Sequence, residues 1–278
     1  MSRIWFASEL ETVATFWRVL RRDGVTLGFT THDRDLWFDG VLHRAAPGML
    51  PSSIRRSADF EPDSAEVQGA LSHEAISAAD LAAGRFDGAQ LRIGLVDWET
   101  VDWETVERAI LYRGAIGGVT EEAGSFSAEL VSRKAELLRD PVPRTSPACR
   151  AAFCGVGCAL SSAAFTHEAV LSAIDFDANA VTLDMAPPPA DCVGGMLRWL
   201  DGPHAGMAMT VMALAGSALV LDTPLDAALA PGPRGMVREG CDHTLDTCAT
   251  RFANAVNFQG EPFLPGNDLL SRYPTPAQ

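Results

Sequence analysis

Two short cysteine-rich stretches decide how the second half of this chain folds: CRAAFCGVGC, from Cys149 to Cys158, and CDHTLDTC, from Cys241 to Cys248. Five of the six cysteines lie in these two windows, and 82 residues separate the windows. Thiolates bind soft metals in sets of four, because a tetrahedral centre needs four donors. If the first and second cysteine windows meet in space, they clamp the intervening chain into one closed lobe.

Length and composition indicate a globular protein, and the charge narrows its partners. The chain has 278 residues, of which 47% are apolar and 21% charged, so two domains with real cores are expected. Its formal net charge is −14 and its pI is about 4.8. A protein that wraps DNA tightly needs a surplus of Lys and Arg, which this chain lacks. An acidic surface past which DNA slides without binding remains compatible with this charge.

The sequence predicts a protein that is made in the cytoplasm and does not insert into a membrane. No stretch reaches the roughly 18 uninterrupted apolar residues that a membrane span requires. The N-terminus, MSRIWFASELE, has no basic region, apolar core or cleavage site of a secretory signal. Thiols stay reduced in the cytoplasm, so clustered cysteines there favour metal binding over disulfides.

The first domain is expected to span residues 1–140 and to be a compact β-barrel or sandwich with small helices. Ser8 and Glu11 form a capping-box pattern, and apolar residues then recur at helical spacing, which predicts a helix to about Asp23. A second short helix is expected to start at Ser77. Alternating or buried apolar runs predict the strands 25–30, 36–38, 41–45, 65–70, 89–98, 109–116 and 124–131. His32 and His43 are expected to be solvated turn and strand residues.

The second domain is expected to span residues 141–278, starting at a proline-rich linker that runs from Asp140 to Pro147. Between the cysteine windows the sequence predicts two strands within 169–185 and a small meander of strands at 194–200, 207–213 and 218–222. One or two helical turns are expected within 246–254. The tail from Asn257 is expected to lie extended against a partner or against the protein's own surface.

The cysteine spacing leaves the metal open. Cys149 and Cys158 have eight residues between them, and Cys241 and Cys248 have six, unlike the C-x2-C knuckles of zinc fingers or the compact motif of ferredoxins. Zinc and an iron–sulfur cluster are equally compatible with this spacing, and disulfides or unrelated core thiols are a third alternative. Cys154 could take the place of Cys149 as a ligand. Cys192 lies outside both windows and is expected to fill a buried apolar position.

Three longer stretches carry a specific resemblance: RDGVTLGFTTHDRDLWFDG (22–40), CRAAFCGVGCALSSAAFT (149–166) and GCDHTLDTCATRFANAVNFQGEPFLPG (240–266). They resemble the baseplate hub, or tail-tip, family of long-tailed phages and phage-derived gene transfer agents. The cysteine spacing is similar to that of λ-type tail-tip proteins, which hold an iron–sulfur cluster. The resemblance implies a cluster, of the 4Fe-4S type, on Cys149, Cys158, Cys241 and Cys248, and favours iron–sulfur over zinc.

The resemblance also implies a structural role and a set of partners. Hub proteins of this family form a three-fold ring around the DNA conduit and begin with a domain like the tail-tube β-barrel. A homotrimer is therefore expected, with a distal tail protein on one side and a central tip or fibre protein on the other. Assembly in the bacterial cytoplasm and a place in the baseplate of a virion-like tail follow from the same resemblance.

An iron–sulfur redox enzyme and a zinc-stabilised binding module are the alternative functions. The chain has no Rossmann glycine motif, no G-x-S-x-G and no H-E-x-x-H, so no catalytic residues are assigned. His167-Glu168 and Asp242-His243 are isolated pairs that are expected to be solvated. Asp242 and His243 could alternatively hydrogen-bond near a cysteine sulfur. The acidic charge disfavours a nucleic-acid-binding zinc module.

Overall fold

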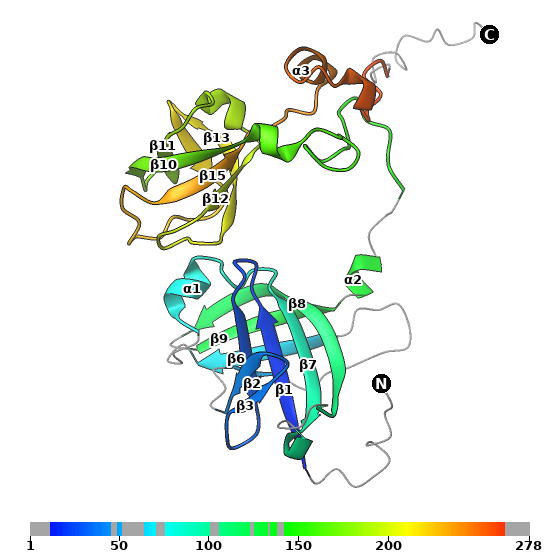
Figure 1. The fold of residues 1–278 in the computed structure, drawn as a ribbon, viewed down its shortest axis with the longest axis vertical. Helices are drawn as coiled ribbons and strands as arrows, with labels where there is room; N and C mark the ends of the chain where they lie inside the picture. The colour runs from blue at the N-terminus through cyan, green and yellow to red at the C-terminus, as the bar shows by residue number, and fades with distance from the viewer. Residues whose placement is uncertain are drawn as a thin grey trace, which may run out of the picture. The chain divides into compact units, whose positions relative to one another are not determined.

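The chain divides into two compact units, Met1–Asp140 and Pro141–Gln278, and each is mainly β (Figure 1). The structure is a computed structural model that describes residues 12–45, 49–51, 64–70, 76–100, 106–122, 125–132, 134–137 and 142–264. The unit boundary coincides with the start of the proline-rich stretch. Among these described residues, no helix has the length and apolar character needed to cross a membrane.

The described strands of the first unit form one nine-stranded sheet in the order β3-β4-β2-β1-β7-β8-β9-β6-β5. All neighbours pair antiparallel except β2 and β4, which are parallel. The strands are β1 Val13–Leu20, β2 Thr26–Thr30, β3 Leu36–Phe38, β4 Val41–Arg44, β5 Met49–Pro51, β6 Ser64–Ala70, β7 Gln90–Asp97, β8 Arg108–Glu122 and β9 Ser125–Ser132. The helices are α1 Ala78–Ala82 and α2 Lys134–Leu137, and Trp98–Thr100 forms a 3-10 turn.

The predicted strands of this unit are confirmed. The predicted barrel is not, because within the described residues the sheet is open: β3 and β5 are its two edge strands and do not pair with each other. Asp39 and Gly40 form the tight turn between β3 and β4, and both residues have the positive φ that this hairpin turn needs. The short helix after Ser77 is also confirmed: the Ser77 side chain accepts a hydrogen bond from the amide of Asp80.

The predicted N-terminal helix is wrong over its described part, since residues 13–20 form strand β1 in the middle of the sheet. The proposed cap at Ser8 and Glu11 lies outside the described residues. Both faces of β1 are buried: Trp17 and Val19 join one apolar cluster, whereas Ala14 and Phe16 join another on the opposite face. Burial on both faces gives a continuous apolar run, which by periodicity alone resembles a buried helix.

A buried polar network on one face of β1 corrects the expectation that His43 is solvated. The His43 side chain is completely buried, and its Nε2 accepts a hydrogen bond of 2.8 Å from Nε of Arg18. Its Nδ1 lies 3.2 Å from the carbonyl oxygen of Leu36, to which it donates in the neutral tautomer. Arg18 also pairs with Asp39 at 3.0 Å. Burial, followed by the positive charge of Arg18, lowers the pKa of His43 to about 4.

Six strands of the second unit form a closed barrel in the order β10-β11-β14-β13-β12-β15, with β15 paired back to β10. Register shifts in the β10–β11 and β13–β14 pairs mark irregularities that bend strands and assist closure. The strands are β10 Thr166–Asp175, β11 Ala180–Asp184, β12 Met196–Trp199, β13 Ala208–Ala215, β14 Ala218–Leu221 and β15 Arg234–Arg238. The barrel core includes Leu197, Trp199, Met209, Val211 and Val237, all at most 1% exposed.

The sequence-based prediction of a simple meander missed β15, and with it the closure of the barrel. This strand has only five residues, contains a glycine and follows Pro233, so its apolar alternation is weak. It pairs with β10 on one side and with β12 on the other, and no other described strand pairs with both of them. The other predicted strands of the unit are present, and residues 245–250 form helix α3 (Leu245–Thr250). The short 3-10 turns of the unit are Ser162–Phe165, Pro189–Cys192 and Ala255–Asn257.

Candidate metal centre

The two cysteine windows meet in the second unit. They belong to residues 142–165 and 239–264, which flank the barrel in sequence and which we call the cysteine segment. The amide of Cys149 donates to the carbonyl of His243 at 2.8 Å, so the start of the first window lies against the second. The described part of the tail also pairs with the first window. The amide of Arg150 donates to the carbonyl of Gln259 at 3.1 Å, and the amide of Glu261 donates to the carbonyl of Ser146 at 2.8 Å.

The electrostatics indicate which thiols are neighbours. Burial raises the pKa of the Cys248 thiol, and the charges of Cys149, Cys158 and Cys241 raise it further. Burial likewise raises the pKa of Cys241, to which Cys158 and Cys149 also contribute. Cys248 therefore interacts with all three of the other cysteines predicted as ligands.

Two of the predicted sulfurs accept hydrogen bonds from backbone amides, and a third lies near a side-chain amide. The amide of Gln259 lies 3.3 Å from Sγ of Cys149, and the amide of His243 lies 3.4 Å from Sγ of Cys241. Nδ2 of Asn254 donates to the carbonyl of Cys158 at 2.7 Å and lies 3.7 Å from its Sγ. Donors directed at sulfur stabilise a thiolate more than a thiol, which suits a metal ligand.

Close packing of the backbone fixes where the windows can lie. Gly240 precedes Cys241, and a Cβ atom at this position would overlap the carbonyl of Val193. Gly260 follows Gln259, and a Cβ atom there would come within 2.7 Å of the Ala148 carbonyl oxygen. An aromatic trio of Phe153, Phe165 and Phe252 joins the two halves of the segment, with ring centroids 4.9 to 5.5 Å apart. These contacts assemble the segment from both sides of the barrel sequence.

The donor chemistry of the segment fits a thiolate-bound group, although the described side chains do not form a ready shell for a single ion. No group of three or more His, Cys, Asp or Glu residues within the described ranges is placed to hold a metal ion. A further cation lies nearby: the charge of Arg238 lowers the pKa of Cys154, against the larger raising effect of burial. The Arg238 Nε is buried and has no hydrogen-bond partner among the described residues. An anionic thiolate centre would give this donor a partner.

The remaining cysteines and the Asp242-His243 pair have separate roles. Cys154 has a positive φ of 57° and interacts electrostatically with Cys158 and Cys241. Cys192 is completely buried in the barrel core, as predicted, and burial raises the pKa of its thiol to about 11. The backbone of His243, not its ring, approaches sulfur. The Asp242 carboxylate instead accepts hydrogen bonds from Thr244 and Thr247 at the start of α3.

Three residues that contact the site were not identified from the sequence: Asn254, Gln259 and Arg238. The first two lie in the stretch RFANAVNFQGEPF, whose resemblance to the hub family assigns no role to its polar residues. Asn254 is only 6% exposed, which marks it as a buried polar residue with a structural task. No periodicity or spacing in the sequence could have indicated this placement.

Comparisons with known proteins agree with one another over most of the chain. The family model described as baseplate hub protein, N-terminal attachment domain, matches residues 4–161. The model described as phage conserved hypothetical protein BR0599 matches residues 193–268. A solved chain from the virion of a native gene transfer agent particle is 32% identical, with a TM-score of 0.79. The similarity covers 98% of this chain and 95% of that chain. No curated protein matches.

These similarities define a structural component of a phage-type tail rather than an enzyme. The chain belongs to the baseplate hub protein family. The first family match extends past the first unit and includes Cys149, Cys154 and Cys158, whereas the second includes Cys241 and Cys248.

Proposed function

We propose that the protein is a baseplate hub that forms a three-fold ring around the DNA conduit of a phage-like tail. The ring joins a distal tail protein of the tube side to a central tip or fibre protein. In this proposal Cys149, Cys158, Cys241 and Cys248 hold an iron–sulfur cluster, of the 4Fe-4S type, which fastens the cysteine segment. A bound cluster supplies cross-linking through four metal–thiolate bonds, and no redox step is required.

The observation that carries the structural role of the cluster is the contrast in apolar burial within the second unit. The apolar core cluster of this unit contains only residues between Ala169 and Val237, none of which belongs to the cysteine segment. In the cysteine segment, Ala151, Cys248 and Phe252 are the buried apolar residues among those described. Such a segment needs another source of stability, and metal binding supplies folding free energy to small cysteine-rich regions.

Exposed apolar side chains support an assembly role for the same segment. Val156, Val256 and Phe263 are 104%, 90% and 88% exposed in the isolated chain. Docking of this segment against another protein would remove these apolar side chains from water. The acidic net charge of −14 supports a conduit for DNA, because a surface of like charge does not retain the passing polyanion.

Anaerobic purification with metal analysis tests the cluster. The wild-type protein should be brown, with a broad visible absorption that bleaches on reduction, and should contain iron and acid-labile sulfide. Cys241→Ser should lose the absorption and fail to assemble into particles while the first unit stays folded. Cys192→Ala is the matched control: it removes a buried thiol of the barrel core and should retain the cluster.

Two results would contradict the proposal. A colourless protein that contains zinc would establish the zinc-stabilised alternative. A metal-free protein whose cysteine segment is protected from hydrogen exchange would show that the segment is stable without a cluster. The ring is tested separately, by native mass spectrometry and electron microscopy of the assembled protein. A stable monomer under conditions in which particles assemble would contradict the trimer.

A further inference from the structure

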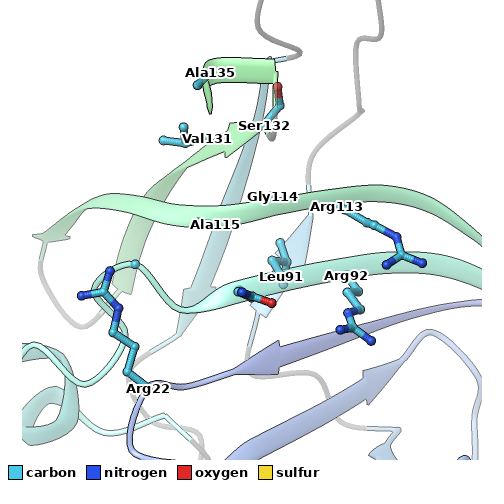
Figure 2. Close-up of a pocket in the computed structure, with 11 residues that line it drawn as sticks. Arg22, Leu91, Arg92, Arg113, Gly114, Ala115, Val131, Ser132 and Ala135 are labelled. Atoms are coloured by element: carbon cyan, nitrogen blue, oxygen red, sulfur yellow. The ribbon is translucent and has the colours of Figure 1, made fainter. Parts of the chain in front are cut away.

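A pocket of about 460 Å³ lies in the first unit on the sheet formed by β7, β8 and β9 (Figure 2). Figure 2 shows Arg92 and Arg113 on adjacent strands and Arg22 on the turn after β1, which supply three guanidinium groups to the lining. The rest of the lining is mixed: Gln90 and Ser132 are polar, and Ala115, Val131 and Ala135 are apolar.

The strand register places like charges opposite each other. Arg92 on β7 is the direct partner of Arg113 on β8, and Arg18 on β1 is the direct partner of Arg92. Directly opposed residues share a face of the sheet, and like charges in that position destabilise it. Three neighbouring strands therefore each contribute an arginine to one row on one face.

The arginines of the pocket differ from their neighbours in lacking acidic partners. Arg18 pairs with Asp39 at 3.0 Å, and Arg85 pairs with Asp23 at 2.8 Å. Within the described residues, Arg22, Arg92 and Arg113 form no ion pair with an acid. The chain carries 36 acidic residues against 22 basic ones, so this local excess of positive charge runs against its overall composition.

The chemistry of the lining favours a carboxylate-bearing protein segment over DNA. A guanidinium group binds a carboxylate through two parallel hydrogen bonds, and the apolar surface at Ala115 and Val131, on the same face of the sheet as Arg92 and Arg113, suits the aliphatic part of a peptide. A DNA duplex would bring a long row of phosphates to a chain whose net charge is −14, whereas a short acidic segment needs only the pocket. The matching family model describes an attachment domain, in agreement with a protein partner.

We infer that this pocket binds an acidic peptide segment of a neighbouring tail protein through Arg22, Arg92 and Arg113. The inference rests on the proposed function only in that the acidic segment is assigned to another protein of the tail. The bound carboxylates offset the repulsion within the Arg92–Arg113 pair, so binding and relief of strand repulsion are coupled. The pocket is independent of the cysteine segment, which belongs to the other unit.

Calorimetric titration of the full-length chain with a hexaglutamate peptide tests the inference at low and at physiological salt. The double variant Arg92→Gln/Arg113→Gln should bind the peptide at least roughly tenfold more weakly than wild type, given the strength of hydrogen bonds to charged groups. Its thermal stability should be unchanged or higher, because the substitution removes a like-charge pair. Arg198→Gln is the matched control, since Arg198 is an exposed arginine on the barrel, and it should bind like wild type.

Each other outcome overturns the inference. Absence of peptide binding by wild type rejects the site, and a less stable double variant assigns the arginines a structural role instead. Equal binding by the double variant and the control rejects the pocket as the location. Parallel titrations use inorganic phosphate and a duplex oligonucleotide, and tight duplex binding that the double variant loses would replace the peptide with nucleic acid. Iron content and ring formation are measured on the same samples, so failure of the proposed function is recognised separately.

Discussion

The barrel and the cysteine segment of the second unit are neighbours in one chain but are stabilised in different ways. The barrel closes a ring of six strands around Trp199, Met209 and other buried apolar residues, and the Trp199 indole N–H donates to Sδ of Met209 at 3.3 Å. The cysteine segment has few buried apolar residues and depends on backbone pairing, an aromatic trio and converging thiols. Hydrophobic burial stabilises the barrel, and we propose that a metal–thiolate link fastens the cysteine segment.

Removal of a predicted ligand should have the largest effect and should separate the two regions. Cys248→Ser should abolish the visible absorption, because it removes one of the four proposed thiolate ligands. Loss of a structural metal centre costs on the order of 10 kcal/mol of the stability of the region that it fastens. Hydrogen exchange measured by mass spectrometry should then rise throughout residues 142–165 and 239–264 and stay low in β10 to β15. Cys154→Ser is the control and should retain the absorption. If Cys154→Ser loses the absorption and Cys149→Ser keeps it, Cys154 rather than Cys149 is the ligand.

Truncation in the barrel should destabilise both regions, in contrast to loss of a cysteine. Trp199 is 1% exposed, so Trp199→Ala should cost about 3–5 kcal/mol of barrel stability through lost burial and a cavity. Exchange should rise in the barrel and also in the cysteine segment, since Arg251 and Gly240 attach that segment to the barrel through Asp191. Trp37→Ala, at a tryptophan that is 62% exposed on β3, should change stability by less than about 0.5 kcal/mol. Unchanged barrel protection in Trp199→Ala would contradict this account.

Mild acid should weaken the first unit and leave the contrast within the second unit intact. His43 has a pKa of about 4 when folded and an ordinary value of 6.5 when unfolded. Between these pH values the unfolded state binds the extra proton, so stability is fully present above pH 6.5 and decreases as the pH falls toward 4. The loss should reach about 3 kcal/mol. Exchange protection of β1 and β4, followed across this range, measures it.

The non-titrating variant His43→Gln provides the control for this acid response. Its stability should be lower at neutral pH, because the buried contacts with Arg18 and Leu36 change, and should depend less on pH in the same range. An unchanged slope in this variant would assign the acid sensitivity to other groups.

Local patterns in the sequence predicted the strands well where one face of a strand is polar and failed where tertiary context decides. Strand β12 alternates buried Leu197 and Trp199 with half-buried Met196 and exposed Arg198, and it was predicted. Strand β1 is buried on both faces and was mistaken for a helix, because nothing within its own residues indicates a second covering layer. Strand β15 gains its stability from two partners that are distant in sequence, so its five residues alone give little indication.

The candidate site shows the same division between residue type and placement. The clustering of the cysteines identified the candidate ligands, since five cysteines in two short windows are typical of a thiolate-bound metal. Their ligand role stays a prediction. Asn254, which bridges Cys158 to the 3-10 turn after α3, could not be identified, because an asparagine in a polar stretch is ordinarily a surface residue.

The smallest expected effect concerns this asparagine and tests whether hydrogen bonds alone maintain the cysteine segment. Asn254→Ala removes the donor to Cys158 and the acceptor for Asn257, both at 2.7 Å, which should cost about 1–2 kcal/mol of local stability. Absorption should persist, while exchange rises near Cys158 and α3. Asn179→Ala is the matched control: Asn179 bonds Leu221, Thr223 and Leu225 in the barrel, so exchange should rise there instead. If Asn254→Ala opens the whole segment in cluster-loaded protein, hydrogen bonding rather than the thiols is the main link between its two halves.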